Sequence, residues 1–372
     1  MAMANDRFKV GESDFSYRLG KVGQRANYTW YRGEGCRFNP AGRNLETAKD
    51  VAEFVLDGWL PPRPFIGPKT RVSAFGSCFA EHISSWLERR NFVVVTRKNG
   101  DYAKAYVVRC GEGMVNSFVI RQQLEWTFED RHFEEELWHG YDAQAFGYDE
   151  SVRVMTRAAF DETDVFIITL GLSEVWYDDV SGGVFWRAIP KNKFDARRHR
   201  FRVSTVDENR SNIRRIYDLI AKFRPEAKII FTLSPIPLVA TFRPVSCITA
   251  NSVSKAILRA SLDEVLRDVA AEGRAFYWPS YEIVMELFDN QWRPDRRHVR
   301  PEILDFVMTL FEAHWCEGKA QFSTEEAWIR ARLACSRLPR RLSRFLADLR
   351  CWWLRACQPG ALAGAPPAGQ GR

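Results

Sequence analysis

Short, uninterrupted runs of apolar residues alternate with longer amphipathic stretches along much of this chain. The apolar runs have the length of β-strands and cover residues 72–76, 92–95, 164–170, 227–233 and 275–278. Apolar residues recur at helical spacing in residues 79–90, 207–223, 253–271 and 301–314. Strands that are apolar throughout and separated by helices are typical of a parallel sheet covered on both faces. The pattern therefore predicts an α/β fold, in which ligands bind at the carboxyl ends of the strands.

The other segments do not follow this pattern. Residues 1–65 are irregular, and we expect them to form an N-terminal arm packed on a main domain that spans residues 66–318. Residues 97–160 and 177–204 are expected to be long, loop-rich insertions that cover the ligand site.

The positive charge of the chain is confined to its C-terminal part. The 372 residues include 54 Lys and Arg against 47 Asp and Glu, which gives a net charge of +7. Between Trp328 and Cys357 there are eight arginines and one acid, Asp348, so this segment alone accounts for the +7. The rest of the chain is neutral, and we therefore expect no nucleic-acid partner.

The basic segment predicts a tail with two alternative roles. We expect residues 319–358 to form a basic amphipathic helical tail and the Gly/Ala/Pro-rich residues 359–372 to be disordered. Residues 340–356 place leucines, a phenylalanine and tryptophans on one helical stripe, with arginines elsewhere. Such a helix can lie on an anionic membrane surface, or it can dock on the main domain with its arginines in solvent. The sequence favours neither role.

The usual signals for secretion, membrane insertion and cofactor binding are missing from the sequence. Residues 1–10 are polar, and no apolar run approaches the roughly 18 residues of a membrane span. The eight cysteines form no C-x-x-C pair, and the histidines lack metal-ligand spacing. Neither a Walker loop nor a complete G-x-G-x-x-G is present. We therefore expect a cytoplasmic protein, peripheral to a membrane at most, with reduced thiols and without metal or cofactor.

Polar groups follow three of the predicted strands or strand regions. Gly76-Ser77-Cys78 brings a hydroxyl and a thiol to a predicted helix N-terminus, where free N–H groups favour a thiolate or an oxyanion. Gly171-Leu172-Ser173-Glu174 is a second glycine turn, and Asp295 stands three residues before His298. An Asp at that spacing can orient the imidazole and leave its other nitrogen free as a base. Taken singly, the Gly76-Ser77-Cys78 turn is an ordinary helix N-cap, and the segment from Asp295 to His298 is an ordinary charged turn. The occurrence of all three motifs in order after predicted strands favours a catalytic site.

These motifs resemble the GSCFA family, which is grouped with the SGNH/GDSL hydrolase superfamily. The signature itself is Gly76-Ser77-Cys78-Phe79-Ala80, and the similarity covers roughly residues 65–315. Further matching stretches are Gly113 to Asn116, 167–171, 186–190, 232–236, 251–255, 279–284 and Asp295 to His298 followed by Pro301. The resemblance implies a flavodoxin-like three-layer α/β/α domain with a parallel sheet.

The resemblance also implies a catalytic site. The superfamily places its nucleophile after the first strand in a Gly-Asp-Ser turn, which puts Cys78 at the nucleophile position and Ser77 at that of the Asp. Ser77 as nucleophile is the alternative. His298 and Asp295 match the superfamily's base and its partner. Oxyanion donors are implied in the third motif, where Gly171 matches the glycine and Ser173 stands in place of the usual Asn. A further donor site is implied in the second motif.

That further oxyanion site is the segment Gly113 to Asn116, which matches the second motif of the superfamily less closely.

The implied function is an esterase or an O-acyltransferase that acts on ester-linked acyl groups, for example on a polysaccharide, through a covalent acyl-enzyme. The alternative is a catalytically degenerate domain that binds glycans through Trp126, Trp176, Tyr177 and Trp186.

Overall fold

The computed structural model describes residues 17–19, 24–26, 37–110, 113–140, 143–318, 323–336, 346–352 and 354. Its centre is a five-stranded parallel sheet of β3 (Arg71–Phe75), β4 (Val93–Val94), β7 (Val165–Leu170), β10 (Lys228–Leu233) and β11 (Ala275–Trp278). The spatial order β11-β10-β7-β3-β4 corresponds to 2-1-3-4-5 in chain order, the order of flavodoxin-like folds. The predicted α/β fold with a parallel sheet is confirmed, and each predicted strand is found to within one residue at either end.

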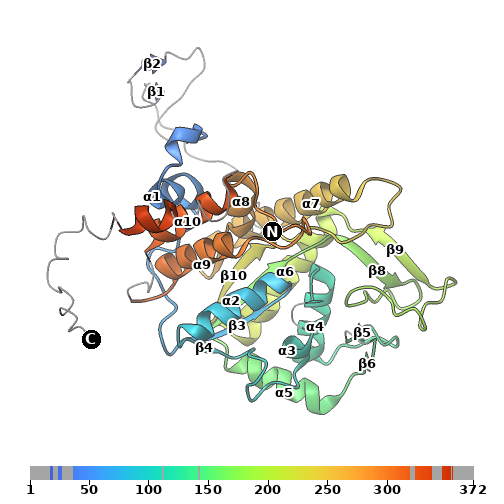
Figure 1. The fold of residues 1–372 in the computed structure, drawn as a ribbon. Helices are drawn as coiled ribbons and strands as arrows, with labels where there is room; N and C mark the ends of the chain where they lie inside the picture. The colour runs from blue at the N-terminus through green and yellow to red at the C-terminus, as the bar shows by residue number, and fades with distance from the viewer. Residues whose placement is uncertain are drawn as a thin grey trace, which may run out of the picture.

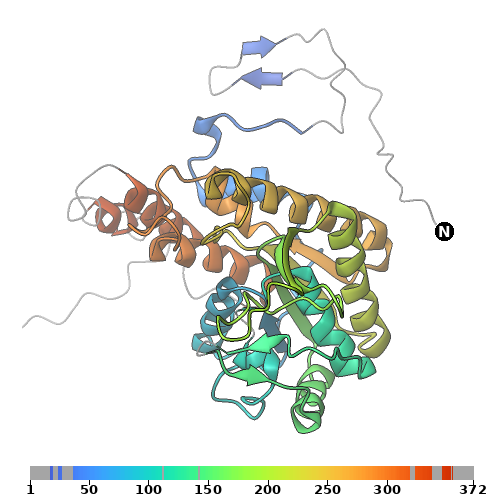
Figure 2. The same cartoon turned by 90° about the vertical axis from the view of Figure 1, so that its right-hand side faces the viewer.

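Two layers of helices cover the sheet, as Figures 1 and 2 show. One layer contains α4 (Ser117–Glu129), α5 (Glu150–Asp161), α6 (Val206–Phe223) and α7 (Cys247–Val269). The other contains α2 (Cys78–Arg89), α8 (Ser280–Glu286) and α9 (Pro301–Trp315). In β7, Phe166 and Ile168 enter the first core while Val165 and Ile167 enter the second. This alternation buries both faces of the strand and explains its continuous apolar sequence.

The segment before β3 packs on the second helix layer. It contains η1 (Gly42–Asn44), α1 (Ala48–Val51) and the π-helical turn η2 (Ala52–Leu56). Val51 and Leu56 are fully buried in the same core as α2 and α9. Further towards the N-terminus, β1 (Tyr17–Leu19) and β2 (Gln24–Ala26) form an antiparallel pair. The rest of residues 1–36, which belong to the predicted arm, lie outside the described residues.

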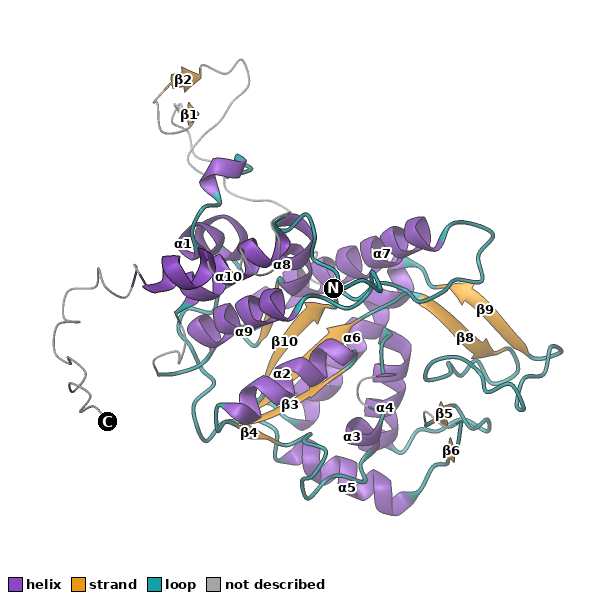
Figure 3. Cartoon of the chain, in the orientation of Figure 1, coloured by secondary structure: helices purple, strands orange, loops and turns teal. Residues whose placement is uncertain are grey.

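The prediction of a loop-rich insertion at 97–160 is wrong. This segment contains α3 (Tyr106–Arg109), α4, α5 and a hairpin of β5 (Trp138–His139) with β6 (Ala145–Phe146). Helix α4 is buried on nearly all sides, so its sequence has no separate apolar stripe to reveal it. Residues 177–204 are loop-rich, as predicted: residues 179–198 form a long connection without helix or strand. The two ends of the segment belong to a second hairpin, β8 (Glu174–Asp178) with β9 (His199–Val203), which stands beyond the sheet in Figure 3.

The C-terminal part also packs on the domain where it is described. Trp328 of α10 (Thr324–Cys335) is buried, and its Nε1 donates to the carbonyl of Glu46 at 2.8 Å. Residues 346–352 are helical, with Ala347 and Cys351 buried and Trp352 67% exposed. The remainder of the predicted basic helix, including 340–345, and the predicted disordered end 359–372 lie outside the described residues. Within the described part of the chain, no helix has both the length and the apolar character needed to cross a membrane.

Candidate active site

The strand order of the sheet reverses between β3 and β7, and the GSCFA signature begins where β3 ends. Such a reversal is where open α/β sheets bind ligands, at the carboxyl ends of the strands. Gly76 has φ +128°, and a β-carbon there would lie 2.1 Å from the carbonyl oxygen of Thr169 in β7. Only glycine fits this close approach, which brings the turn after β3 directly against β7.

Ser77 is held in place by hydrogen bonds on two sides. It is 3% exposed and is the N-cap of α2, where its Oγ accepts from the Phe79 N–H at 3.2 Å. Thr169 ties it to β7, since Oγ1 of Thr169 accepts from the Ser77 N–H at 2.5 Å and donates to Ser77 Oγ at 2.9 Å. Thr169 was not among the predicted site residues, although a polar residue in an otherwise apolar strand was a usable signal.

Cys78, in contrast, is partly accessible to solvent. It is a reduced thiol of intermediate exposure and the first residue of α2. The first-turn N–H groups of a helix and its dipole stabilise negative charge at this position, which favours a thiolate. The other described cysteines are reduced too, but burial raises the pKa of Cys110 to about 12 and of Cys335 to about 11.

Asp295 and His298 form the predicted pair in the loop before α9. Nδ1 of His298 lies 2.5 Å from Oδ2 of Asp295, and Oδ1 of Asp295 accepts from the N–H groups of Arg297 and His298, each at 3.1 Å. The hydrogen bond with His298 lowers the pKa of Asp295 to about 2. Asp295 is therefore ionised near neutral pH and holds the imidazole with Nδ1–H towards it, which leaves Nε2 free to exchange protons.

The course of α9 directs this pair towards the edge of the sheet that carries Cys78. The last residue of α9, Trp315, accepts at its carbonyl from the N–H groups of Phe65 and Ile66, at 3.1 and 3.0 Å. Those two residues precede β3, so α9 ends near the amino edge of the sheet. A helix of 15 residues is about 22 Å long. Its start, with His298 just before it, therefore lies towards the carboxyl edge.

The predicted oxyanion donors differ in how far their N–H groups are already used in hydrogen bonds within the protein. The Gly171 N–H donates to the carbonyl of Val115 at 2.7 Å, and the Gly113 N–H donates to that of Cys110 at 2.9 Å. These two N–H groups hold the turns together. The Gly171–Val115 bond nevertheless brings Asn116 beside the end of β7. Asn116 is buried and caps α4 through Oδ1, while its Nδ2 group has no acceptor among the described residues.

Ser173 lies one step further from the strand. It is fully buried, its N–H donates to Ser254 Oγ at 2.8 Å, and its own Oγ has no partner among the described residues. The Ser173 carbonyl accepts from Ser204. Its contacts thus tie the start of β8 to α7 and to the end of β9, as expected of a packing residue.

Comparison with known protein families identifies the family of this chain. The GSCFA family model matches residues 71–311, a span that covers the sheet and each of the predicted site residues. The chain belongs to the GSCFA family. No curated protein matches it. The GSCFA domain therefore has its signature motif at the topological switch point of a parallel sheet, with Cys78 at a helix N-terminus.

The GSCFA domain also contains a site residue that was not predicted. Lys255 of α7 is 2% exposed, and its Nζ donates to the carbonyls of Gly171, Ser234 and Ile236 at 2.6, 2.8 and 2.9 Å. In the sequence, Lys255 continues the apolar stripe of α7 through Leu258. A charged residue on a buried stripe was the signal that could have identified it.

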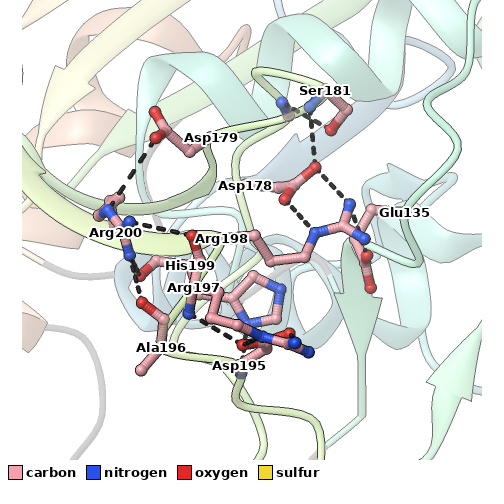
Figure 4. A network of polar contacts seen from close by, with 11 residues as sticks. Glu135, Asp178, Asp179, Ser181, Asp195, Ala196, Arg197, Arg198, His199 and Arg200 are labelled. Carbon is pink, nitrogen blue, oxygen red and sulfur yellow. Dashed lines mark hydrogen bonds and ion pairs between the residues drawn. The ribbon is translucent and has the colours of Figure 1, made fainter.

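One cluster outside this site has the chemistry of a metal site, and an arginine occupies it (Figure 4). Ligand atoms of Glu135, Asp178 and His199 lie within 4.8 Å of one another. The Arg198 guanidinium donates to Asp178 at 2.6 and 2.7 Å and lies 3.0 Å from Glu135. It holds the pKa of Asp178 well below its usual range and supplies the positive charge that the carboxylates need. The cluster fastens the β8–β9 hairpin to the segment before β5.

Proposed function

We propose that this GSCFA protein is an SGNH-type esterase or O-acyltransferase with Cys78 as nucleophile and His298, held by Asp295, as acid and base. The observation that carries the proposal is the contrast between adjacent residues at the switch point. Ser77 is buried and its hydroxyl is engaged by the Phe79 N–H and by Thr169, whereas Cys78 is partly accessible at the start of α2. A group must be reachable by substrate to attack it, which favours Cys78.

The proposed reaction has two steps. In the first, the Cys78 thiol gives its proton to Nε2 of His298, and the sulfur attacks the ester carbonyl carbon. The C–S bond forms, the C–O ester bond breaks, and the departing alkoxide takes the proton back from His298. The product is an acyl thioester on Cys78 and a free alcohol.

The second step releases the acyl group. Water or a second hydroxyl gives its proton to His298 and attacks the thioester carbonyl. The C–S bond breaks, and the Cys78 sulfur takes the proton back from His298. Water yields a carboxylic acid, and a sugar hydroxyl yields a new ester. In both steps the carbonyl oxygen becomes negatively charged, and the proposed donors to it are the N–H of Cys78 and the Nδ2 group of Asn116, each worth roughly 3 kcal/mol.

Turnover of p-nitrophenyl acetate by point variants tests the proposal. Cys78→Ala and His298→Ala should each lower kcat by about 10²-fold or more, because each removes a group that the chemistry requires. His132→Ala, at an exposed histidine of another loop, is the matched control and should behave as the unaltered protein. Unchanged turnover in both site variants would contradict the proposal. Adding a soluble polysaccharide then separates the two activities, since a transferase acetylates it and an esterase releases acetate.

The non-catalytic alternative has less support. Of the aromatic residues considered for glycan binding, Trp126 and Trp186 are 1% and 2% exposed and pack in the core, so they offer no face to a sugar. Trp176 is partly buried and packs edge-on against Phe242 at 4.8 Å between ring centres. Saturable glycan binding without turnover, unaffected by His298→Ala, would favour this alternative.

A further inference from the structure

The buried charge of Lys255 is unusual because no carboxylate balances it within the described part of the chain. An ammonium removed from water is costly unless it is paired or fully hydrogen-bonded. Three carbonyl groups surround its Nζ, from Gly171, Ser234 and Ile236. Carbonyls only accept, so three such bonds need three N–H groups, and an ammonium has three where a neutral amine has two. The coordination of Lys255 is therefore that of a cation.

The position of this cation relates it to Cys78. In the paired register of β3 and β7, Phe75 lies beside Ile168. Cys78 and Gly171 each stand three residues beyond that pair, at the carboxyl ends of neighbouring parallel strands. Lys255 bonds the carbonyl of Gly171, so its charge lies at the switch point next to the turn that carries the thiol.

The electrostatics agree with this geometry. Burial lowers the pKa of Lys255 to about 7, and the negative charge of Cys78 acts in the opposite direction and raises it. The interaction is mutual, since a thiolate that favours the ammonium is itself favoured by it. The other ionisable groups to consider come from two elements. Glu81, which pairs with Lys98, and His82 stand in the first turns of α2, and Asp295 and His298, the proposed catalytic pair, stand in the loop before α9.

We propose that Lys255 is a positioning residue whose buried positive charge, at the carboxyl edge of the sheet, keeps Cys78 in its thiolate form. Lys255 has no N–H left over for a substrate, because all three are donated to carbonyls. Its effect on Cys78 is therefore through charge. The inference uses the nucleophile of the proposed function but concerns only the ionisation of Cys78, so it can be tested without any turnover.

The pH dependence of alkylation by iodoacetamide, followed at Cys78 by peptide mass mapping, is the first test. Lys255→Gln keeps two N–H donors for the carbonyls and removes the charge. It should raise the apparent pKa of Cys78 by about one unit, which slows alkylation about tenfold at pH values below the pKa of the unaltered protein. Lys228→Gln removes a charge from the amino end of β10, at the opposite edge of the sheet, and should change nothing. An equal pKa in the unaltered protein and both variants would overturn the proposal.

A second measurement keeps Lys255 in place, in case its replacement prevents folding. Cys78→Ala removes only a partly exposed thiol. By reciprocity, the Lys255 ammonium should then titrate at lower pH than in the unaltered protein, as followed by the ¹³Cε chemical shift of labelled lysine. The same titration midpoint in both proteins would overturn the proposal. If no ester is turned over and these shifts are nevertheless found, the proposed function fails and the role of Lys255 stands.

Discussion

Replacing Gly76 by alanine should destabilise the domain, because a β-carbon has no room at the turn after β3. The added carbon would lie 2.1, 2.6 and 2.8 Å from the carbonyl oxygen, Oγ1 and backbone N of Thr169, and most of these atoms are backbone of the central strand. Overpacking of this kind costs about 1–3 kcal/mol, and the φ of +128° adds backbone strain of about 1–3 kcal/mol. The expected loss is thus roughly 2–6 kcal/mol, or a fall in Tm on the order of 10 °C.

Gly182→Ala is the matched control for this prediction. Gly182 also has a positive φ, +72°, but a β-carbon added there would meet nothing within 4 Å, so only the strain of about 1 kcal/mol applies. Urea unfolding followed by tryptophan fluorescence would measure both free energies of unfolding. If Gly76→Ala lost no more stability than Gly182→Ala, the close contact between the signature turn and β7 would be refuted.

Three further changes probe the site and its surroundings. Arg198→Met leaves the buried Asp178 carboxylate unpaired and should lower the free energy of unfolding in urea by about 2–3 kcal/mol. This is less than for a fully buried pair, because the Arg198 guanidinium is 33% exposed. Arg197→Met, at a side chain that is 91% exposed, should cost almost nothing, and equal losses in the two variants would contradict the prediction. Ser77→Ala removes the N-cap of α2 and should cost about 1 kcal/mol while turnover of p-nitrophenyl acetate persists; complete loss of turnover in a folded variant would instead favour Ser77 as nucleophile. The pKa of Asp295 is lowered to about 2 in the folded protein, so its contribution to stability is present above about pH 4 and disappears as the pH falls towards 2. Asp295→Asn should therefore lower Tm at pH 6 and leave it unchanged near pH 2, and a Tm difference that persisted at pH 2 would argue against the ion pair.

The sequence was sufficient for those elements whose local pattern reflects their environment. The strand Val165–Leu170 is buried on both faces and is apolar throughout, so its sequence alone predicted a central position. Helix α6 presents one buried stripe and was predicted almost to the residue. Helix α4 is buried around its circumference and shows no such stripe, and this is why the segment containing it was mistaken for loops.

The candidate site was predictable to a similar extent. Asp295 and His298 are three residues apart, and local spacing was enough to pair them. The bond from Thr169 to Ser77 spans 92 residues, and that from Lys255 to Gly171 spans 84. Such partners meet only because parallel strands end at one edge. Thr169 and Lys255 could each be recognised in the sequence as a polar residue in an otherwise apolar pattern. Their contacts with Ser77 and Gly171 could be found only in the structure.

The central claim, that Cys78 is the nucleophile, is tested most directly by the intact mass of the protein after brief exposure to p-nitrophenyl acetate and acid quenching. The unaltered protein and Ser77→Ala should each gain the mass of one acetyl group, because the thioester accumulates before water releases it. Cys78→Ala should gain none. An acetyl adduct that forms on Cys78→Ala and is absent from a folded Ser77→Ala variant would contradict the account.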